Sequence, residues 1–108
     1  MDIRAHLIGY PRIGPNRELK RALERAWAGR LETDAFSMRI KELRAAHLAE
    51  QREAIGSAVD DYFLYDQVLE TAMMLGVAPA EDAGRIGEDP FAVLTALARG
   101  TPEREAWE

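Results

Sequence analysis

The chain has 108 residues, of which 47% are hydrophobic and 31% are charged, and it contains no cysteine. This length allows one domain at most, and the missing cysteines exclude a disulfide scaffold, a thiol nucleophile and an iron–sulfur site. The net charge of -5, with the two signs interspersed, argues against a nucleic-acid partner. Because no long apolar stretch is present, we expect a cytoplasmic protein with no membrane-spanning segment.

The first predicted element is a short strand at residues 3–9, which leads into a constrained turn at residues 9–16 with two glycines and two prolines. A helix is predicted next, with Asn16 as its N-cap and Gly29 just past its end. Its apolar residues follow helical spacing and are Leu19, Ala22, Leu23, Ala26 and Trp27.

A second helix is predicted from Thr33 to Ile55, with an apolar stripe along one face and Gly56 as its stop. Residues 58–63 are the second strand candidate, although two aspartates interrupt them. We expect the two strands to lie parallel and adjacent, joined by a right-handed crossover through the intervening helices.

A third helix is predicted at residues 64–75. The fourth begins at Asp89, with Pro90 in the first turn, and ends at Gly100. A further helical pattern begins at Pro102 and is cut off where the sequence ends. The order of strand, two helices, strand and two helices indicates a mostly helical α/β fold, the opening portion of a larger domain.

The turn before the first helix is the best candidate for a binding site. It brings Arg12, Arg17, Lys20 and Arg21 near a helix start whose free backbone N–H groups favour an anion. Arg25, two turns further along, is expected to lie outside this site. The alternative, which the residue pattern alone favours, is a tight turn with its cations solvated on an exposed face.

Other residues are weaker candidates for chemistry. His6 and His47 are far apart in the sequence, so no metal site is predicted, and His47 is expected to be a hydrogen-bonded core residue. The acidic residues Asp60, Asp61 and Asp66 are read either as acid/base groups at a strand end or as turn and cap residues.

Several motifs in the same order along the chain resemble the N-terminal domain of the cobalamin-independent methionine synthase family. The resemblance covers nearly the whole chain. Its motifs are Gly-Tyr-Pro-Arg-Ile-Gly at 9–14, Arg-Glu-Leu-Lys at 17–20, Lys-Glu-Leu-Arg at 41–44 with His47, Leu-Tyr-Asp-Gln-Val-Leu-Glu-Thr at 64–71, Met-Leu-Gly-Val at 74–77 and Ala-Arg-Gly at 98–100.

This resemblance implies a fold and a function. The family builds two (β/α)8 barrels, so residues 1–108 would be the opening β-α-α-β-α-α portion of an incomplete barrel. Its reaction, a step of methionine biosynthesis, transfers a methyl group from 5-methyltetrahydropteroyl-polyglutamate to homocysteine. Zinc and homocysteine bind in the C-terminal barrel, so no cofactor is expected in this stretch, which would be inactive alone.

The family's folate contacts, chiefly to the glutamate tail, map onto Arg17, Glu18, Leu19 and Lys20. One departure concerns residues 59–63, which read Val-Asp-Asp-Tyr-Phe where the family usually has Val-Gly-Asp-Phe-Ser. The alternative is therefore a diverged, free-standing remnant that acts as a helical interaction module and forms a homo-oligomer.

Overall fold

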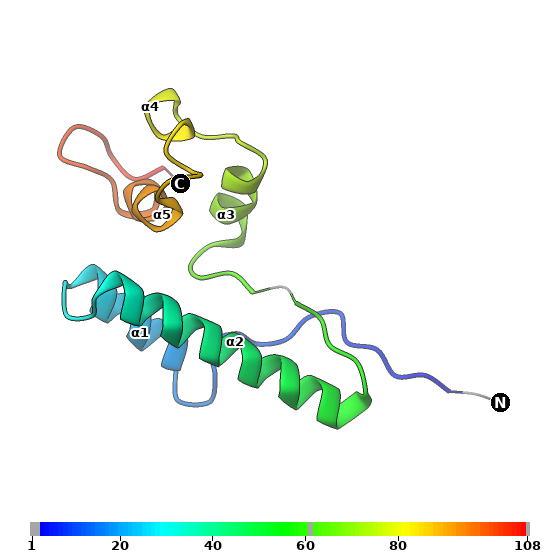
Figure 1. Cartoon of the computed structure of the whole chain (residues 1–108). Helices are drawn as coiled ribbons and strands as arrows, with labels where there is room; N and C mark the ends of the chain where they lie inside the picture. Colours follow the sequence, from blue (N-terminus) through cyan, green and yellow to red (C-terminus); the bar gives the residue numbers. More distant parts are fainter. Residues whose placement is uncertain (1–2, 61, 108) are drawn as a thin grey trace. The chain divides into compact units, whose positions relative to one another are not determined.

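The structure, a computed structural model, describes residues 3–60 and 62–107, and this part of the chain contains five α-helices (Figure 1). The chain divides into two compact units, Met1–Tyr62 and Phe63–Glu108, each with its own buried apolar residues. No helix among the described residues is both long enough and apolar enough to cross a lipid bilayer.

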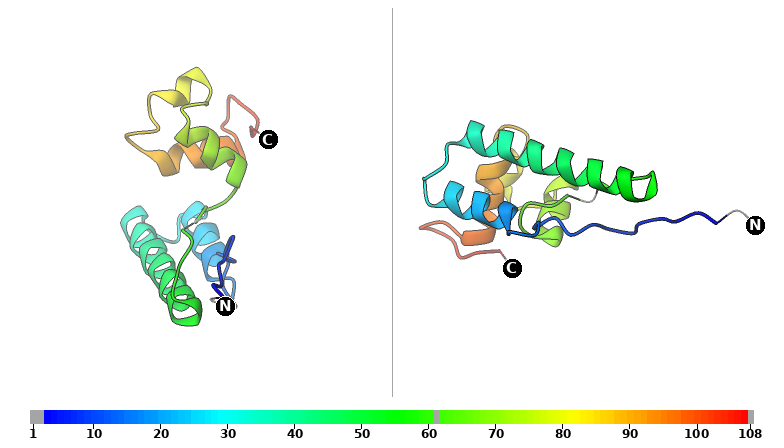
Figure 2. Two further views of the ribbon diagram at one scale, coloured as in Figure 1. Left: turned by 90° about the vertical axis from the view of Figure 1, so that its right-hand side faces the viewer. Right: turned by 90° about the horizontal axis from the view of Figure 1, so that it is seen from below.

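The first unit is a helical hairpin, in which α1 (Glu18–Trp27) and α2 (Thr33–Ile55) run antiparallel and side by side (Figures 1 and 2). Burying each large apolar side chain stabilises it by about 1.5–3 kcal/mol. The buried apolar residues are Leu19, Ala22 and Leu23 from α1 and Phe36 and Leu43 from α2. The predicted bounds of α2 are confirmed, and Gly56 ends it in the left-handed conformation with φ 76°.

The start of α1 differs from the sequence prediction. Arg17, not Asn16, is the N-cap, and its left-handed backbone (φ 58°, ψ 38°) carries a strain of about 1–3 kcal/mol. The Arg17 N–H donates to the carbonyl of Gly14 at 3.2 Å, and the Asn16 N–H donates to the Glu18 carboxylate at 3.2 Å. This carboxylate also fills the space that a side chain at position 14 would need. The Glu18 carboxylate accepts the hydrogen bond of the Asn16 N–H, so Asn16 stays in the turn. The helix therefore begins one residue later than predicted.

The second unit contains α3 (Gln67–Met74), the short α4 (Ala80–Ala83) and α5 (Pro90–Arg99), and α3 packs against α5. The predicted α5 is confirmed, whereas α3 is shorter than the predicted range of 64–75. A helix of one turn such as α4 shows no periodicity, so the sequence analysis missed it. The buried apolar residues of this unit are Leu69, Met73, Val93, Leu94, Leu97 and Ala98.

Aspartates cap both longer helices of this unit. Asp66 Oδ1 accepts hydrogen bonds from the N–H groups of Val68 and Leu69, both at 2.9 Å. Asp89 Oδ1 accepts one from the N–H of Ala92 at 3.0 Å. Of the two interpretations of Asp66, the cap is the one that the structure supports, since its carboxylate is engaged by the backbone.

The helix predicted from Pro102 is wrong over the described residues, and its last residue lies outside them. The chain turns back instead, with Thr101 and Arg104 forming an isolated antiparallel bridge. The N–H of Trp107 then donates to the carbonyl of Leu97 at 2.7 Å, so the segment lies against the end of α5. That tertiary hydrogen bond replaces the local ones of a helix.

Neither predicted strand is present in the described residues. Residues 3–9 have no strand hydrogen bonding, and the side chain of Ile3 is 85% exposed. The described part of residues 58–63 is also irregular, and Asp61 lies outside it. Strands need neighbouring strands to pair with, and these segments have none here, so the predicted parallel pair and its crossover are wrong. The mostly helical character is confirmed, while the barrel stays a prediction.

Candidate functional site

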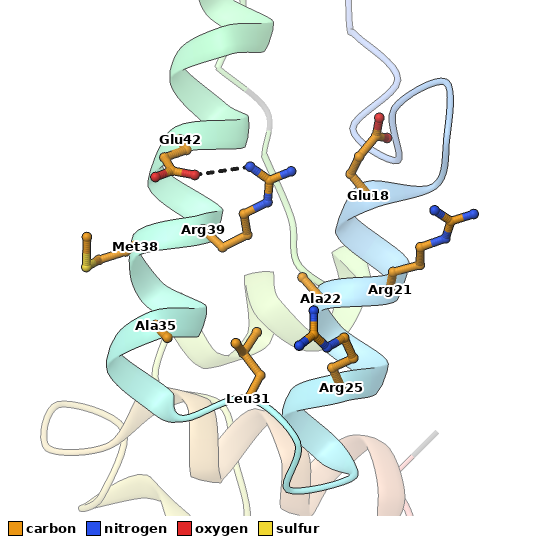
Figure 3. Close-up of a pocket in the computed structure, with 9 residues that line it drawn as sticks. All are labelled: Glu18, Arg21, Ala22, Arg25, Leu31, Ala35, Met38, Arg39 and Glu42. Carbon is orange, nitrogen blue, oxygen red and sulfur yellow. Dashed lines mark hydrogen bonds and ion pairs between the residues drawn. The ribbon is translucent and has the colours of Figure 1, made fainter.

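An open pocket of about 450 Å³ lies between α1 and α2 in the first unit (Figure 3). Charged side chains from both helices line it, together with small and apolar ones. From α1 and the loop after it come Glu18, Arg21, Ala22, Arg25 and Leu31, and from α2 come Ala35, Met38, Arg39 and Glu42. The guanidinium groups of Arg25 and Arg39 lie beside an apolar surface, with Arg21 at the edge of the pocket, and this arrangement suits an anion that also carries methylene groups.

The two carboxylates of the pocket already have donors. Glu42 accepts a hydrogen bond from Arg39 at 3.1 Å, an exposed pair worth about 0–1 kcal/mol. Glu18 accepts from its own backbone N–H and from one in the preceding turn, and these bonds, helped by the charge of Arg21, lower the pKa of Glu18 despite its partial burial. In the described residues no carboxylate lies within ion-pair distance of Arg25. The pocket therefore keeps positive charge available to a ligand.

The structure separates the four binding residues that the resemblance implied. Leu19 belongs to the hairpin core, with only 2% of its surface exposed. Lys20 is exposed and lies 3.7 Å from the carboxylate of Glu24. Arg17 is exposed at the N-cap of α1, and Glu18 is the one member of the four that lines the pocket. The side chains of Arg17, Glu18 and Lys20 are thus at the surface of the first turn of α1, the side chain of Leu19 is in the core, and their role in folate binding stays a prediction.

Two arginines of the pocket were missed by the sequence analysis. Arg25 was expected to lie outside the site at the helix start, which stays a prediction, and it lines the pocket between α1 and α2 together with Arg21. The two are four residues apart and so share a side of α1, a spacing that the sequence already contains. Arg39 carried no such signal, because it reaches the pocket only when α2 folds back against α1.

A second polar group surrounds His47 on α2. The imidazole is buried, and its ring centroid lies 5.5 Å from that of Tyr10 and 5.8 Å from that of Tyr62. The Tyr10 hydroxyl donates a hydrogen bond to Glu50. Within the described part of the chain, neither His47 Nδ1 nor the Tyr62 hydroxyl has a hydrogen-bond partner. His47 is a core residue as predicted, but Nδ1 lacks the expected hydrogen bond.

The remaining candidates for chemistry are accounted for by ion pairing or exposure. Asp60 forms a two-pronged pair with Arg44, in which Nε lies 2.9 Å from Oδ1. The hydrogen-bonded guanidinium lowers the pKa of Asp60, so this carboxylate is a poor proton donor at neutral pH. His6 is exposed, and Asp61 lies outside the described residues. Among those residues, no cluster of three or more histidine or acidic side chains could hold a metal ion.

Comparison with known proteins identifies the family. Residues 4–108 match the family described as "Cobalamin-independent synthase, N-terminal domain". Three relatives, each named 5-methyltetrahydropteroyltriglutamate–homocysteine methyltransferase, are similar over most of the chain. The protein of Caulobacter vibrioides is 42% identical over 111 residues, that of Herpetosiphon aurantiacus 42% over 101 and that of Xylella fastidiosa 46% over 100.

These alignments cover 100%, 93% and 86% of this chain but only 14%, 13% and 12% of the three relatives, respectively. The chain thus corresponds to a small part of the length of each relative. The matched family is described as a cobalamin-independent synthase, and the relatives carry the name of a methyl transfer to homocysteine. This chain belongs to the cobalamin-independent methionine synthase family, within its N-terminal domain.

Proposed function

We propose that this chain contributes part of the binding site for the glutamate tail of 5-methyltetrahydropteroyl-polyglutamate and does not transfer methyl groups by itself. The names of its relatives give 5-methyltetrahydropteroyltriglutamate and homocysteine as the reactants of those enzymes. The proposal brings only the first of these to this chain, because the chain spans 14% or less of those relatives.

The observation that carries the proposal is the cationic start of α1. Arg17 at the N-cap and Lys20 in the first turn are both exposed there. The dipole of a helix start favours a negatively charged ligand, and here the cationic side chains carry the attraction because the N–H groups of Glu18 and Leu19 are already engaged. The pair of Lys20 with Glu24 is exposed and worth about 0–1 kcal/mol, so a ligand carboxylate replaces it at little cost. These two cations suit the carboxylates of a glutamate tail.

Calorimetry at low salt tests this function. We expect 5-methyltetrahydrofolate triglutamate to bind more tightly than the monoglutamate, with a difference that shrinks as salt rises. Arg17→Ala and Lys20→Ala should reduce that difference, whereas Arg52→Ala and Lys41→Ala on α2 serve as matched controls. Equal affinity for the two folates, or equal effects of all four substitutions, would contradict the proposal. The cations at the start of α1 would then be solvated surface charges with no ligand.

The proposal also assigns the binding of zinc and homocysteine to regions of the family's enzymes that lie outside residues 1–108. Zinc prefers cysteine and histidine ligands, and the chain contains two histidines and no cysteine. We expect metal analysis after dialysis to find far less than one zinc ion per chain. One tightly held zinc ion per chain, or methyl transfer by the chain alone, would contradict this assignment.

Self-association is a second candidate function, favoured by apolar side chains exposed on the second unit. Their exposed fractions are 75% for Val68, 81% for Met74, 75% for Leu75 and 55% for Val77. If another copy covers them, light scattering should show a mass that rises with concentration, and Leu75→Lys should lower it. Thr71→Lys, at an exposed polar position of α3, is the control. A monomer at all concentrations would exclude this function.

A further inference from the structure

We propose that the pocket between α1 and α2 binds the outer carboxylates of a poly-γ-glutamate chain through Arg25 and Arg39, with Arg21 at the edge of the pocket. This inference rests on the proposed function and extends the tail site from the start of α1 into the helical hairpin. The ligand is the γ-linked chain itself, and the pteridine ring has no part in it.

The charges of the pocket favour such a ligand. Figure 3 shows Arg39 reaching from α2 toward α1 and Arg25 extending into the same gap, whereas the side chain of Arg21, one turn above on α1, points away from α2 at the edge of the pocket. Arg25 has no ion-pair partner among the described residues, and the pair of Arg39 with Glu42 is exposed on both sides. Since backbone N–H groups hold the Glu18 carboxylate, an incoming carboxylate meets two guanidinium groups that are free or easily released.

The spacing of the arginines on α1 matches the repeat of the ligand. Arg17, Arg21 and Arg25 are separated by four residues each, which is a rise of about 6 Å per step along the helix. A γ-linked glutamate unit contributes five main-chain bonds, and an extended chain advances about 1.2 Å per bond, so its repeat is also about 6 Å. Successive carboxylates of the tail can therefore follow successive arginines from the N-cap into the pocket.

The apolar part of the pocket suits the rest of each glutamate unit. Every γ-linked unit carries two methylene groups between its charged positions. Ala22, Leu31, Ala35 and Met38 line the pocket beside the arginines, and Met38 is 64% exposed in the free chain. Covering such side chains with methylene groups removes apolar surface from water, which inorganic polyphosphate of equal charge does not do. The pocket should therefore prefer the organic polyanion.

Calorimetry with γ-linked triglutamate and hexaglutamate, both lacking the pteridine, tests the inference on the whole 108-residue chain at low salt. We expect the hexaglutamate to bind about two- to five-fold more tightly, since each exposed ion pair contributes modestly. Arg25→Gln and Arg39→Gln should each remove most of this gain and leave the triglutamate affinity nearly unchanged. Arg52→Gln and Lys41→Gln, on α2 outside the pocket, are the matched controls. Circular dichroism melts check that every variant is folded.

The two proposals fail in different ways. If Arg17→Ala and Lys20→Ala weaken the binding of both peptides but Arg25→Gln and Arg39→Gln leave the gain intact, the pocket inference is overturned and the proposed function stands. If the pocket variants remove the gain while the substitutions at the start of α1 have no effect, the pocket binds the tail and the proposed site at the helix start is wrong. Equal affinity for γ-linked hexaglutamate and a linear polyphosphate of the same net charge would also overturn the inference, because it removes the role of the apolar surface.

Discussion

The side-chain amide of Gln51 bonds to both main-chain polar groups of Val59. Its Nε2 donates to the Val59 carbonyl at 3.2 Å, and its Oε1 accepts from the Val59 N–H at 2.8 Å. Gln51 is only 2% exposed, so these bonds form away from solvent. One side chain of α2 thus gives this residue the hydrogen bonds that a neighbouring strand would otherwise supply.

Replacing Gln51 with Leu should lower the free energy of unfolding of the first unit by about 1–3 kcal/mol, because the Val59 N–H and carbonyl lose their partners while partly buried. Urea denaturation followed by circular dichroism measures the change. Glu53→Ala, at an exposed position of the same helix, should stay within about 0.5 kcal/mol of the wild type. A Gln51→Leu variant as stable as this control would mean that Val59 is not held by the amide.

Removing the cap of α3 with Asp66→Ala should destabilise the second unit by about 1 kcal/mol, since two backbone N–H groups lose their acceptor. Hydrogen exchange at Val68 and Leu69 should become faster in this variant. Asp66→Asn keeps an oxygen acceptor and is the matched control. Unchanged exchange at both amides in Asp66→Ala would argue that the carboxylate does not cap the helix in solution.

The ion pair of Arg44 with Asp60 should give the first unit an acid-dependent part of its stability. Hydrogen bonding to the guanidinium lowers the pKa of Asp60 below its ordinary value, so the contribution is complete above that ordinary value and is lost as the pH falls through the lower, folded-state pKa. Both side chains are more than one-third exposed, which limits the contribution to about 1 kcal/mol or less. Arg44→Gln should flatten the loss of stability measured by melts between neutral and strongly acidic pH. Arg52→Gln should leave it unchanged, and an identical acid profile in both variants would contradict the role of the pair.

Tyr62→Phe should leave the stability of the first unit unchanged or raise it at neutral pH. The Tyr62 hydroxyl is buried and has no hydrogen-bond partner in the described residues, so removing it relieves a cost of burial. Burial raises the pKa of Tyr62, although the charges of Arg12 and Arg39 oppose this shift. The contribution of the neutral Tyr62 hydroxyl to the free energy of unfolding is therefore fully present below the ordinary tyrosine pKa, and it is lost as the pH rises through the higher, folded-state pKa.

Melts at increasing alkaline pH check this second part of the prediction. The Tyr62→Phe variant should lose less stability than the wild type over that range. Tyr65→Phe, at an exposed position of the second unit, should follow the wild type. A clear loss of stability in Tyr62→Phe at neutral pH would show that the hydroxyl has a partner in solution.

Features that depend on neighbouring residues in the sequence were predicted well. The bounds of α2 and α5 follow from helical periodicity, from the cap at Asp89 and from the glycines at 56 and 100 that end the two helices. The strands at 3–9 and 58–63 were wrong because a strand is stabilised by residues distant in sequence, and α-helical packing takes that role in this chain. Sequence patterns over a few residues predict where a helix begins and ends, but they do not show whether a strand has a neighbouring strand to pair with.

The same distinction applies to the candidate site. The cationic start of α1 and the shared face of Arg21 and Arg25 are visible in the sequence, because both follow from spacing on one helix. The contribution of Arg39 and the burial of Leu19 depend on how α2 packs against α1. Of the four residues at 17–20, the sequence motif alone did not show that the side chain of Leu19 is buried in the hairpin core.

The turn before α1 sets the charge of the pocket from outside it. The backbone of Gly14 has a φ of 81°, and a Cβ at this position would overlap the carboxylate of Glu18. Any larger residue would push Glu18 away from the N–H groups that hold it and release it toward Arg21, whose charge already acts on it. The space left by the missing Cβ of Gly14 thus lets Glu18 stay bonded to the backbone, so that its carboxylate competes less for the arginines and their charge stays available to molecules from solution.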